Sequence, residues 1–145
     1  MFSIEFDIYR EGAAASPPDT CGGTITIGGF QERFISLLSY WSRADYEKQW
    51  REAVSRIVGD GSNSCLITSI ADPTVSHLLF WWPLYREGEI VHVHSGILFF
   101  DQLDQSFDPR NPYRSVPPRQ QISDDGERIS SWQTTVADFA RYLIA

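Results

Sequence analysis

The chain is 145 residues long and carries a formal net charge of −7. This length predicts one domain over residues 1–145, which can bury about two-thirds of its unfolded surface without disulfides or metal. A hydrophobic content of 42% and an aromatic content of 14% exclude a disordered chain. The acidic balance argues against free nucleic acid as a partner, because phosphate binding needs clustered Lys and Arg.

The sequence also argues against membranes and secretion. The longest apolar run, residues 78–84, contains Pro83 and is too short to span a bilayer. The N-terminus alternates apolar and polar residues, whereas a signal peptide has a basic region followed by a continuous apolar region. Cys21 and Cys65 have no metal-binding or CxxC spacing and are expected to be reduced thiols. We therefore expect a cytoplasmic protein with no membrane partner.

Nearly all of the excess negative charge falls within residues 57–109. This segment has seven acidic residues and a single base, Arg86. An acidic surface attracts basic partners and repels acidic ones. Solubility alone would favour the same bias, and composition does not separate these two interpretations.

The first part of the chain predicts a long hairpin. Residues 2–8 alternate apolar and polar side chains, which is the period of a half-buried strand. Residues 12–19 contain Gly and two prolines and predict the connecting loop. Residues 24–27 are β-branched and end at Gly28 and Gly29, so they predict a second short strand.

Two helices are predicted between residues 30 and 58. The first covers Phe30–Tyr40, where apolar residues recur at spacings of three and four. The second begins at Ser42, an N-cap with Asp45 in the capping-box position, and ends at about Val58. Its predicted apolar face consists of Tyr46, Trp50, Ala53, Val54 and Ile57.

Three strands are predicted next. Cys65–Ile70 is mostly apolar, and His77–Tyr85 shows no polar alternation, so we expect both of its faces to be covered. Arg86–Glu89 predicts a hairpin turn, after which Ile90–Ile97 returns as the partner strand. A strand, a tight turn and a returning strand indicate an antiparallel sheet.

The C-terminal part predicts a long loop, a turn and a helix. Residues 104–118 contain four prolines, and structureless loops of this length are often functional. Asp124–Gly126 predicts a turn between two short strands, the second being Arg128–Gln133, and Thr135–Ile144 predicts a short helix. The predicted fold class is therefore α+β: a mainly antiparallel, twisted sheet with two to three helices packed on one face.

His92 and His94 are the strongest candidates for a metal site. On a strand, residues two apart point to the same face, as two zinc ligands would. A third ligand would have to be His77 or a carboxylate. Two hydrogen-bonded sheet histidines are the simpler interpretation. A metal-dependent enzyme that uses this pair is therefore kept as an alternative.

Other motifs of catalysis and cofactor binding do not match. No GxSxG elbow presents a serine nucleophile, and Cys65 has the apolar flanks of a core strand. Asp101, Asp104 and Asp108 lack the central Gly and terminal Glu of an EF-hand loop. The glycine pairs do not form a dinucleotide-binding GxGxxG motif. We expect no cofactor, no bound metal and no enzymatic activity.

Four segments carry a resemblance to a known family. They are residues 41–59, from Trp41 through Asp45, Trp50 and Arg56 to Gly59, and then residues 65–69, 107–114 and 125–132. Together they resemble immunity proteins of bacterial contact-dependent growth inhibition systems, and the resemblance covers most of residues 30–145. These positions look like caps, turns and helix faces, so they identify the family better than its binding surface.

The resemblance implies a cytoplasmic inhibitor that binds one cognate toxin domain and blocks its active site, with one copy of this chain in the complex. Many such toxins are basic nucleases, which agrees with the acidic segment. No binding residue is carried over from the family. On charge alone, the candidate toxin-binding residues are Glu87, Glu89, Asp101, Asp104, Asp108, Asp124 and Asp125. An adaptor subunit of another complex is a further alternative.

Overall fold

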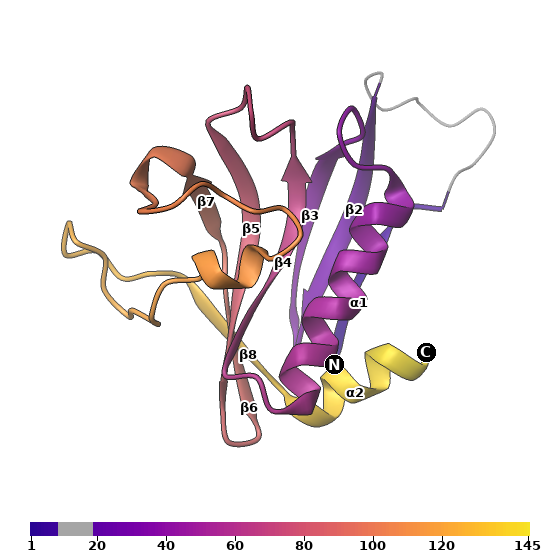
Figure 1. The fold of residues 1–145 in the computed structure, drawn as a ribbon. Coiled ribbons are helices and arrows are strands. Elements are labelled where there is room, and N and C mark those ends of the chain that lie inside the picture. The colour runs from indigo at the N-terminus through magenta and orange to yellow at the C-terminus, as the bar shows by residue number, and fades with distance from the viewer. Residues whose placement is uncertain (9–18) are drawn as a thin grey trace.

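The computed structural model describes residues 1–8 and 19–145, which form two antiparallel sheets and two α-helices (Figure 1). The predicted α+β class is confirmed. Most of the loop predicted at residues 12–19 lies outside the described residues. No helix in the described ranges is both long enough and apolar enough to cross a membrane.

The smaller sheet contains the N-terminal strands in the order β1-β2-β3. These strands are β1 (Phe2–Phe6), β2 (Thr20–Ile27) and β3 (Phe30–Leu37). Ile27 pairs with Phe30, so only two residues form the turn between β2 and β3. The first of them, Gly28, has φ of 61°, a conformation that favours glycine and that primed hairpin turns require.

The helix predicted at residues 30–40 is wrong, because this segment forms β3. Phe30 and Phe34 are four apart, a spacing that fits both one face of a helix and one face of a strand. The two-residue Gly28-Gly29 turn fixes the strand, because it feeds residue 30 directly into pairing with Ile27.

The larger sheet has the order β4-β5-β6-β8, with β7 paired to β5. Its strands are β4 (Asn63–Ile70), β5 (Leu78–Glu87), β6 (Ile90–His94), β7 (Gly96–Phe99) and β8 (Ser131–Thr135). The strands predicted at 65–70 and 77–85 are confirmed. The single strand predicted at 90–97 is interrupted at Ser95, so β6 pairs with one end of β5 and β7 with the other.

The two helices are α1 (Arg43–Gly59) and α2 (Val136–Ile144). The predicted capping box is confirmed: the Ser42 hydroxyl accepts from the Asp45 N–H at 3.2 Å, and the Asp45 carboxylate accepts from the Ser42 N–H at 2.9 Å. The helices pack against each other on the same side of the molecule (Figure 1). Two short 3-10 turns, η1 (Phe100–Gln102) and η2 (Pro112–Ser115), lie in the connection from β7 to β8.

The larger sheet is covered on both faces. Its inner face points to the smaller sheet: Trp82 contacts Trp132, which stacks on Phe30 of β3 with ring centroids 4.2 Å apart. Its outer face lies beneath the connection that carries η1 and η2, and there the Tyr85 hydroxyl donates to the Pro117 carbonyl at 2.9 Å. Leu79, Trp81, Trp82 and Leu84 of β5 are all buried, as the apolar run predicts.

Side chains of α1 close the free edge of β4. The Gln49 amide donates to the Cys65 carbonyl at 2.8 Å and accepts from the Ile67 N–H at 2.9 Å. The indole of Trp50 donates to the Ile67 carbonyl at 2.7 Å. These bonds pair backbone groups that no neighbouring strand reaches, so this edge of the sheet is not left open.

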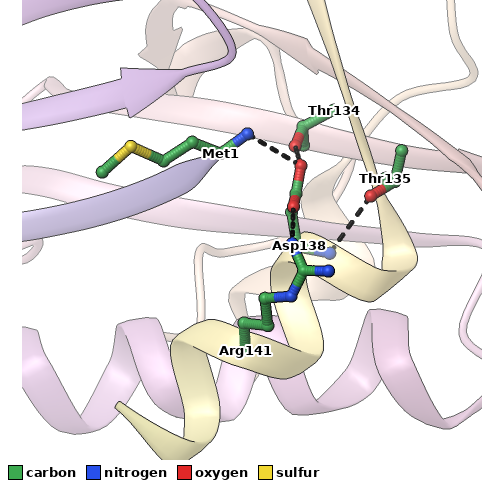
Figure 2. A network of polar contacts seen from close by, with 5 residues as sticks. All are labelled: Met1, Thr134, Thr135, Asp138 and Arg141. Carbon is green, nitrogen blue, oxygen red and sulfur yellow. Dashed lines mark hydrogen bonds and ion pairs between the residues drawn. The ribbon is translucent and has the colours of Figure 1, made fainter.

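The start of β1 is tied to α2 by a polar network around Asp138 (Figure 2). The Asp138 carboxylate accepts from the Met1 ammonium at 2.9 Å, from the Thr134 hydroxyl at 3.0 Å and from Arg141 at 3.1 Å. The Thr135 hydroxyl caps the helix by accepting from the Asp138 N–H at 3.1 Å. The network lowers the pKa of Asp138, chiefly through the bond from the ammonium group.

Candidate functional site

The acidic residues chosen from the sequence do not form one cluster. Glu87 and Glu89 lie at the tip of the β5–β6 hairpin. Asp101 lies in η1, next to the opposite end of β5, where Leu78 pairs with Phe99. Since β5 has ten residues, these two positions are separated by roughly 30 Å along the strand. Figure 1 shows the hairpin tip and η1 at opposite ends of the sheet.

The remaining candidate acids are also spread over different parts of the surface. Asp104 is exposed just after η1, while Asp108 accepts from the Arg110 N–H at 2.9 Å and so forms a local turn. Asp124 and Asp125 are exposed in a turn closed by an isolated bridge between residues 122 and 128. We refer below to Glu87 and Glu89 as the tip acids and to Asp101 and Asp104 as the η1 acids.

Each tip acid has Arg86 or His92 nearby. Arg86 lies 3.6 Å from Glu89, and the Nε2 of His92 lies 3.8 Å from Glu87. Both carboxylates are highly exposed, and exposed ion pairs contribute little to stability. The tip is therefore a small, mixed-charge surface.

An apolar groove opens between the two sheets. Its volume is about 640 Å³, and β3 lines one side while β5 and β7 line the other. Three of its apolar side chains are strongly exposed: Ile35 at 62%, Phe80 at 48% and Ile97 at 44%. Exposed apolar side chains that gather in one groove mark binding surfaces more often than scattered ones do.

The η1 acids do not line this groove but follow it closely in the chain, since Asp101 is four residues after Ile97. Phe80 pairs with Ile97, and Phe99 lies two residues further along the same face of β7 at 40% exposure, immediately before η1. Glu32 and Arg33 of β3 add charged groups to the groove lining. An apolar centre with a charged rim is the usual anatomy of a protein–protein interface.

His92 and His94 share the outer face of β6, as predicted, and both are buried, with exposed fractions of 6% and 5%. His77, the third ligand considered, lies just before the far end of β5. Within residues 1–8 and 19–145, no three His, Cys, Asp or Glu side chains come close enough together to hold a metal ion. The structure therefore does not assemble the ligand set that a metal-dependent enzyme would need.

The two histidines lie in a basic environment. Burial, followed by the positive charge of Arg119, lowers the pKa of both imidazoles. They are therefore neutral at pH 7, each with one N–H donor and one acceptor nitrogen. Both ring nitrogens of His92, the Nε2 of His94 and the Nε of Arg119 are buried without a hydrogen-bond partner among the described residues. Each such group costs about 1–3 kcal/mol, so four together are unusual in a scaffold.

Beside His94 lies a polar cleft of about 560 Å³. Its polar side chains are His94, Arg119, Gln121, Arg128, Ser130, Ser131 and Gln133. A smaller cleft on the other side of Arg119 contains His92 and Glu87. Arg119 thus belongs to both clefts, and the outer face of this acidic protein carries a local basic site.

The comparisons with known proteins establish the family. A family model described as the CdiI N-terminal domain matches residues 36–142. The chain belongs to this family. It is also similar to a protein described as immunity protein CdiI from Enterobacter cloacae subsp. cloacae, with 29% identity over 146 residues that cover 99% of this chain and 97% of the relative.

A solved structure extends this likeness to three dimensions. The fold matches a chain of a structure described as the CdiA-CT/CdiI toxin and immunity complex from Enterobacter cloacae, with a TM-score of 0.84 and 26% identity. The match covers 99% of this chain and 97% of that chain. The resemblance stated from sequence is confirmed, and membership of a family of immunity proteins confirms that this CdiI-family chain is a non-enzymatic inhibitor.

Sequence reasoning missed both clefts. Ile35 was assigned to a helix, which hid its place beside Phe80 and Ile97. A signal was present, since the Gly28-Gly29 turn predicts that β3 is a strand. Arg119 had no such signal, because it lies in a proline-rich loop whose path depends on the packing of Tyr85 against Pro117.

Proposed function

We propose that this chain is the immunity protein of a contact-dependent growth inhibition system and that it binds and neutralises a CdiA-CT toxin domain. One observation carries the proposal: the fold matches, over nearly its whole length, an immunity chain solved in complex with its toxin. The same activity needs no catalytic group in this chain, because an inhibitor acts by occupying the toxin's surface.

Two finer features belong to this proposal. The toxin domain is a nuclease that acts in the cytoplasm, where this chain meets it. The net charge of −7 supports this, because an enzyme that binds nucleic acid carries basic residues and an acidic inhibitor associates with it faster. A single domain over residues 1–145 and one copy of the chain in the complex remain predictions.

The apolar groove is the surface best suited to the toxin. Ile35, Phe80 and Ile97 supply exposed apolar area, and the η1 acids, which follow β7 in the chain, add negative charge that complements a basic nuclease. A standard interface buries about 800 Å² on each partner. A patch of that area has a radius of about 15 Å, so one centred on the groove does not reach Glu87, which lies roughly 20 Å along β5 from Trp81.

The seven acids chosen from the sequence therefore have different expected roles. The η1 acids follow β7 directly and are expected to contact the toxin at the border of the groove. Asp108 precedes Pro109 and Arg110, which line a separate cleft beside the start of α1, so we expect no direct role for it in the groove. Glu87 and Glu89 at the hairpin tip, and Asp124 and Asp125 in their separate turn, lie away from it. We expect these four to contribute at most long-range attraction.

The test uses the toxin domain encoded beside this chain. The domain and this chain are co-expressed, and growth, co-purification and dissociation constant are measured. We expect growth to be restored and a one-to-one complex to form. A toxin domain from an unrelated system is the control and should gain neither protection nor binding. Unprotected growth without co-purification would contradict the proposal, and a purified toxin domain that degrades neither RNA nor DNA would remove the nuclease assignment.

A further inference from the structure

The outer face of the larger sheet carries a second feature that the groove does not use. His94 of β6 and Arg119 line the same polar cleft, and each has a buried polar atom without a partner among the described residues. The groove is lined by Phe80 and Trp82, whereas Tyr85, on the alternate face of β5, contacts the His94 ring with centroids 5.1 Å apart. The two sites are therefore on opposite faces of one sheet.

The cleft offers positive charge and hydrogen-bond donors to one small volume. Arg119 and Arg128 bring two guanidinium groups, and Ser130, Ser131 and Gln133 add neutral polar groups. No carboxylate lines this cleft in the described part of the chain. On the other side of Arg119, by contrast, Glu87 already lies 3.8 Å from the Nε2 of His92.

This chemistry selects the charge of the ligand. A metal cation would be repelled by the two guanidinium groups. An apolar ligand would leave the polar atoms of His94 and Arg119 unpaired. An oxyanion satisfies both demands, because its oxygens accept from planar guanidinium donors and from an imidazole N–H.

We propose that Arg119, Arg128 and His94 form a binding site for an oxyanion, either a free phosphate or the carboxylate of an acidic side chain from a bound protein. Arg119 and Arg128 each supply a guanidinium group to the anion. His94 orients the anion through a ring nitrogen. His92 lines the smaller cleft together with Arg119 and Glu87 and acts as a positioning residue for Arg119.

The chain's three histidines make a direct test. The ring nitrogens are observed by NMR in uniformly ¹⁵N-labelled full-length protein while inorganic phosphate is added at pH 7 and constant ionic strength, with chloride as the reference salt. We expect saturable shifts of the His94 ring and smaller shifts of His92. His77, which lies before the far end of β5, is the internal control and should not move. Shifts of His77 that match those of His94, or shifts that do not saturate, would overturn the site.

Variants separate the site from general charge effects. Arg119→Gln should weaken phosphate binding at least about tenfold, because it removes charge-assisted hydrogen bonds. Arg110→Gln, which removes an exposed arginine elsewhere on the same connection, should leave it unchanged. Thermal melting checks that Arg119→Gln is folded, and Arg128→Gln provides a second variant with the same expected direction. Wild-type affinity in both folded variants would refute the assignment.

A final arm identifies the source of the anion. Acetate replaces phosphate in one titration, and the toxin domain is added in another. Phosphate that still binds in the toxin complex indicates a free anion. A toxin domain that shifts His94 and blocks phosphate indicates a carboxylate of the toxin, and only this arm rests on the proposed function. Failure to bind toxin leaves the phosphate result intact, so the two proposals fail independently.

Discussion

Two edges of this molecule differ in whether helix side chains bond to their backbone groups. At β4, Gln49 and Trp50 of α1 bond directly to the backbone of Cys65 and Ile67. At the groove, no helix side chain bonds to the backbone of residues 30–35 or of β7 within the described ranges, and apolar side chains stand exposed there. One edge is closed by the protein's own helix, while the other has no such bonds among the described residues.

The difference shows how an immunity protein of this family combines stability with binding. An uncovered strand edge is a liability, because its free N–H and C=O groups pair with other chains. The α1 side chains pair the free N–H and C=O groups of β4, so this edge does not offer them to another chain. The groove between β3 and β7 exposes apolar side chains and Glu32 instead, which suit the partner proposed above. Changes at the covered edge should therefore alter stability, and changes at the open edge should alter affinity.

The largest effect is expected from charge placed in the groove. The double variant Phe80→Asp and Ile97→Asp should weaken toxin binding by about 3 kcal/mol or more, over a hundredfold, because interface centres tolerate no unpaired charge. Its free energy of unfolding should fall by only about 1–2 kcal/mol, since both side chains are already about half exposed, although the two new charges face each other on paired strands. Surface plasmon resonance and urea unfolding measure the two quantities.

Ile144→Asp is the matched control, because Ile144 is 87% exposed on α2, away from the groove. It should leave affinity unchanged. Equal affinity of the groove variant and wild type would place the interface elsewhere, and a large loss of stability in the groove variant would mean that the groove is part of the core.

At the covered edge, Gln49→Leu should lower the free energy of unfolding by about 2–4 kcal/mol, because it leaves the Ile67 N–H and the Cys65 carbonyl buried and unpaired. Urea denaturation at pH 7 measures this loss, and Gln105→Leu at an exposed position is the control. Below the transition, folded Gln49→Leu should bind the toxin with wild-type affinity. A stability change under 1 kcal/mol would show that the α1 bonds to β4 are not important, given the usual cost of about 1–3 kcal/mol for each unpaired group.

The sequence predicted the covered part of the fold well. The capping box of Ser42 and Asp45 predicts the start of α1, and the apolar spacing from Tyr46 to Ile57 predicts its buried face. The continuous apolar run of β5 predicts a strand covered on both faces. These signals are local, so each can be read without knowing what the segment packs against. Gln49 is the exception, because a polar side chain on a buried helix face becomes favourable only when the β4 backbone lies opposite.

The binding surfaces were harder to predict for the same physical reason. The groove is lined by β3 on one side and by β5 and β7 on the other, and no local period encodes this arrangement of segments about sixty residues apart. The acids of residues 57–109 are close in sequence but are divided by β5 between opposite ends of the sheet. Arg119 meets His94 only after the connection from η2 folds over the outer face. Composition gives the sign of a protein's charge, whereas the fold decides where that charge acts.

A smaller effect on the covered edge is expected from Tyr46→Phe. The Tyr46 hydroxyl accepts from the Ile70 N–H at 3.0 Å and donates to the Leu37 carbonyl at 2.6 Å. Its loss should lower the free energy of unfolding by about 1–2 kcal/mol at pH 7.

The pH dependence distinguishes this role from simple packing. Burial raises the pKa of Tyr46 from 10.0 to about 12. The neutral phenol therefore stabilises the fold fully below pH 10.0, and this contribution is lost as the pH rises toward about 12. The variant has no phenol to ionise, so the stability gap between wild type and variant should narrow over that range. Tyr85 and Tyr142 also have raised pKa values, but they are common to both proteins. A constant gap from pH 9 to 12 would contradict the assignment.

The smallest effect is expected from the η1 acids. Changing these charges tests which end of the larger sheet meets the toxin. Asp101→Lys with Asp104→Lys should slow association about three- to tenfold at low salt, because exposed charges steer encounter more than they hold the complex. Glu87→Lys with Glu89→Lys makes the same change of charge at the other end of β5 and should slow it less. Stopped-flow association at two salt concentrations compares them. A stronger effect of the tip acids would place the interface at that end of the sheet. Equal effects at both ends would mean that net charge, rather than the η1 acids, guides the toxin.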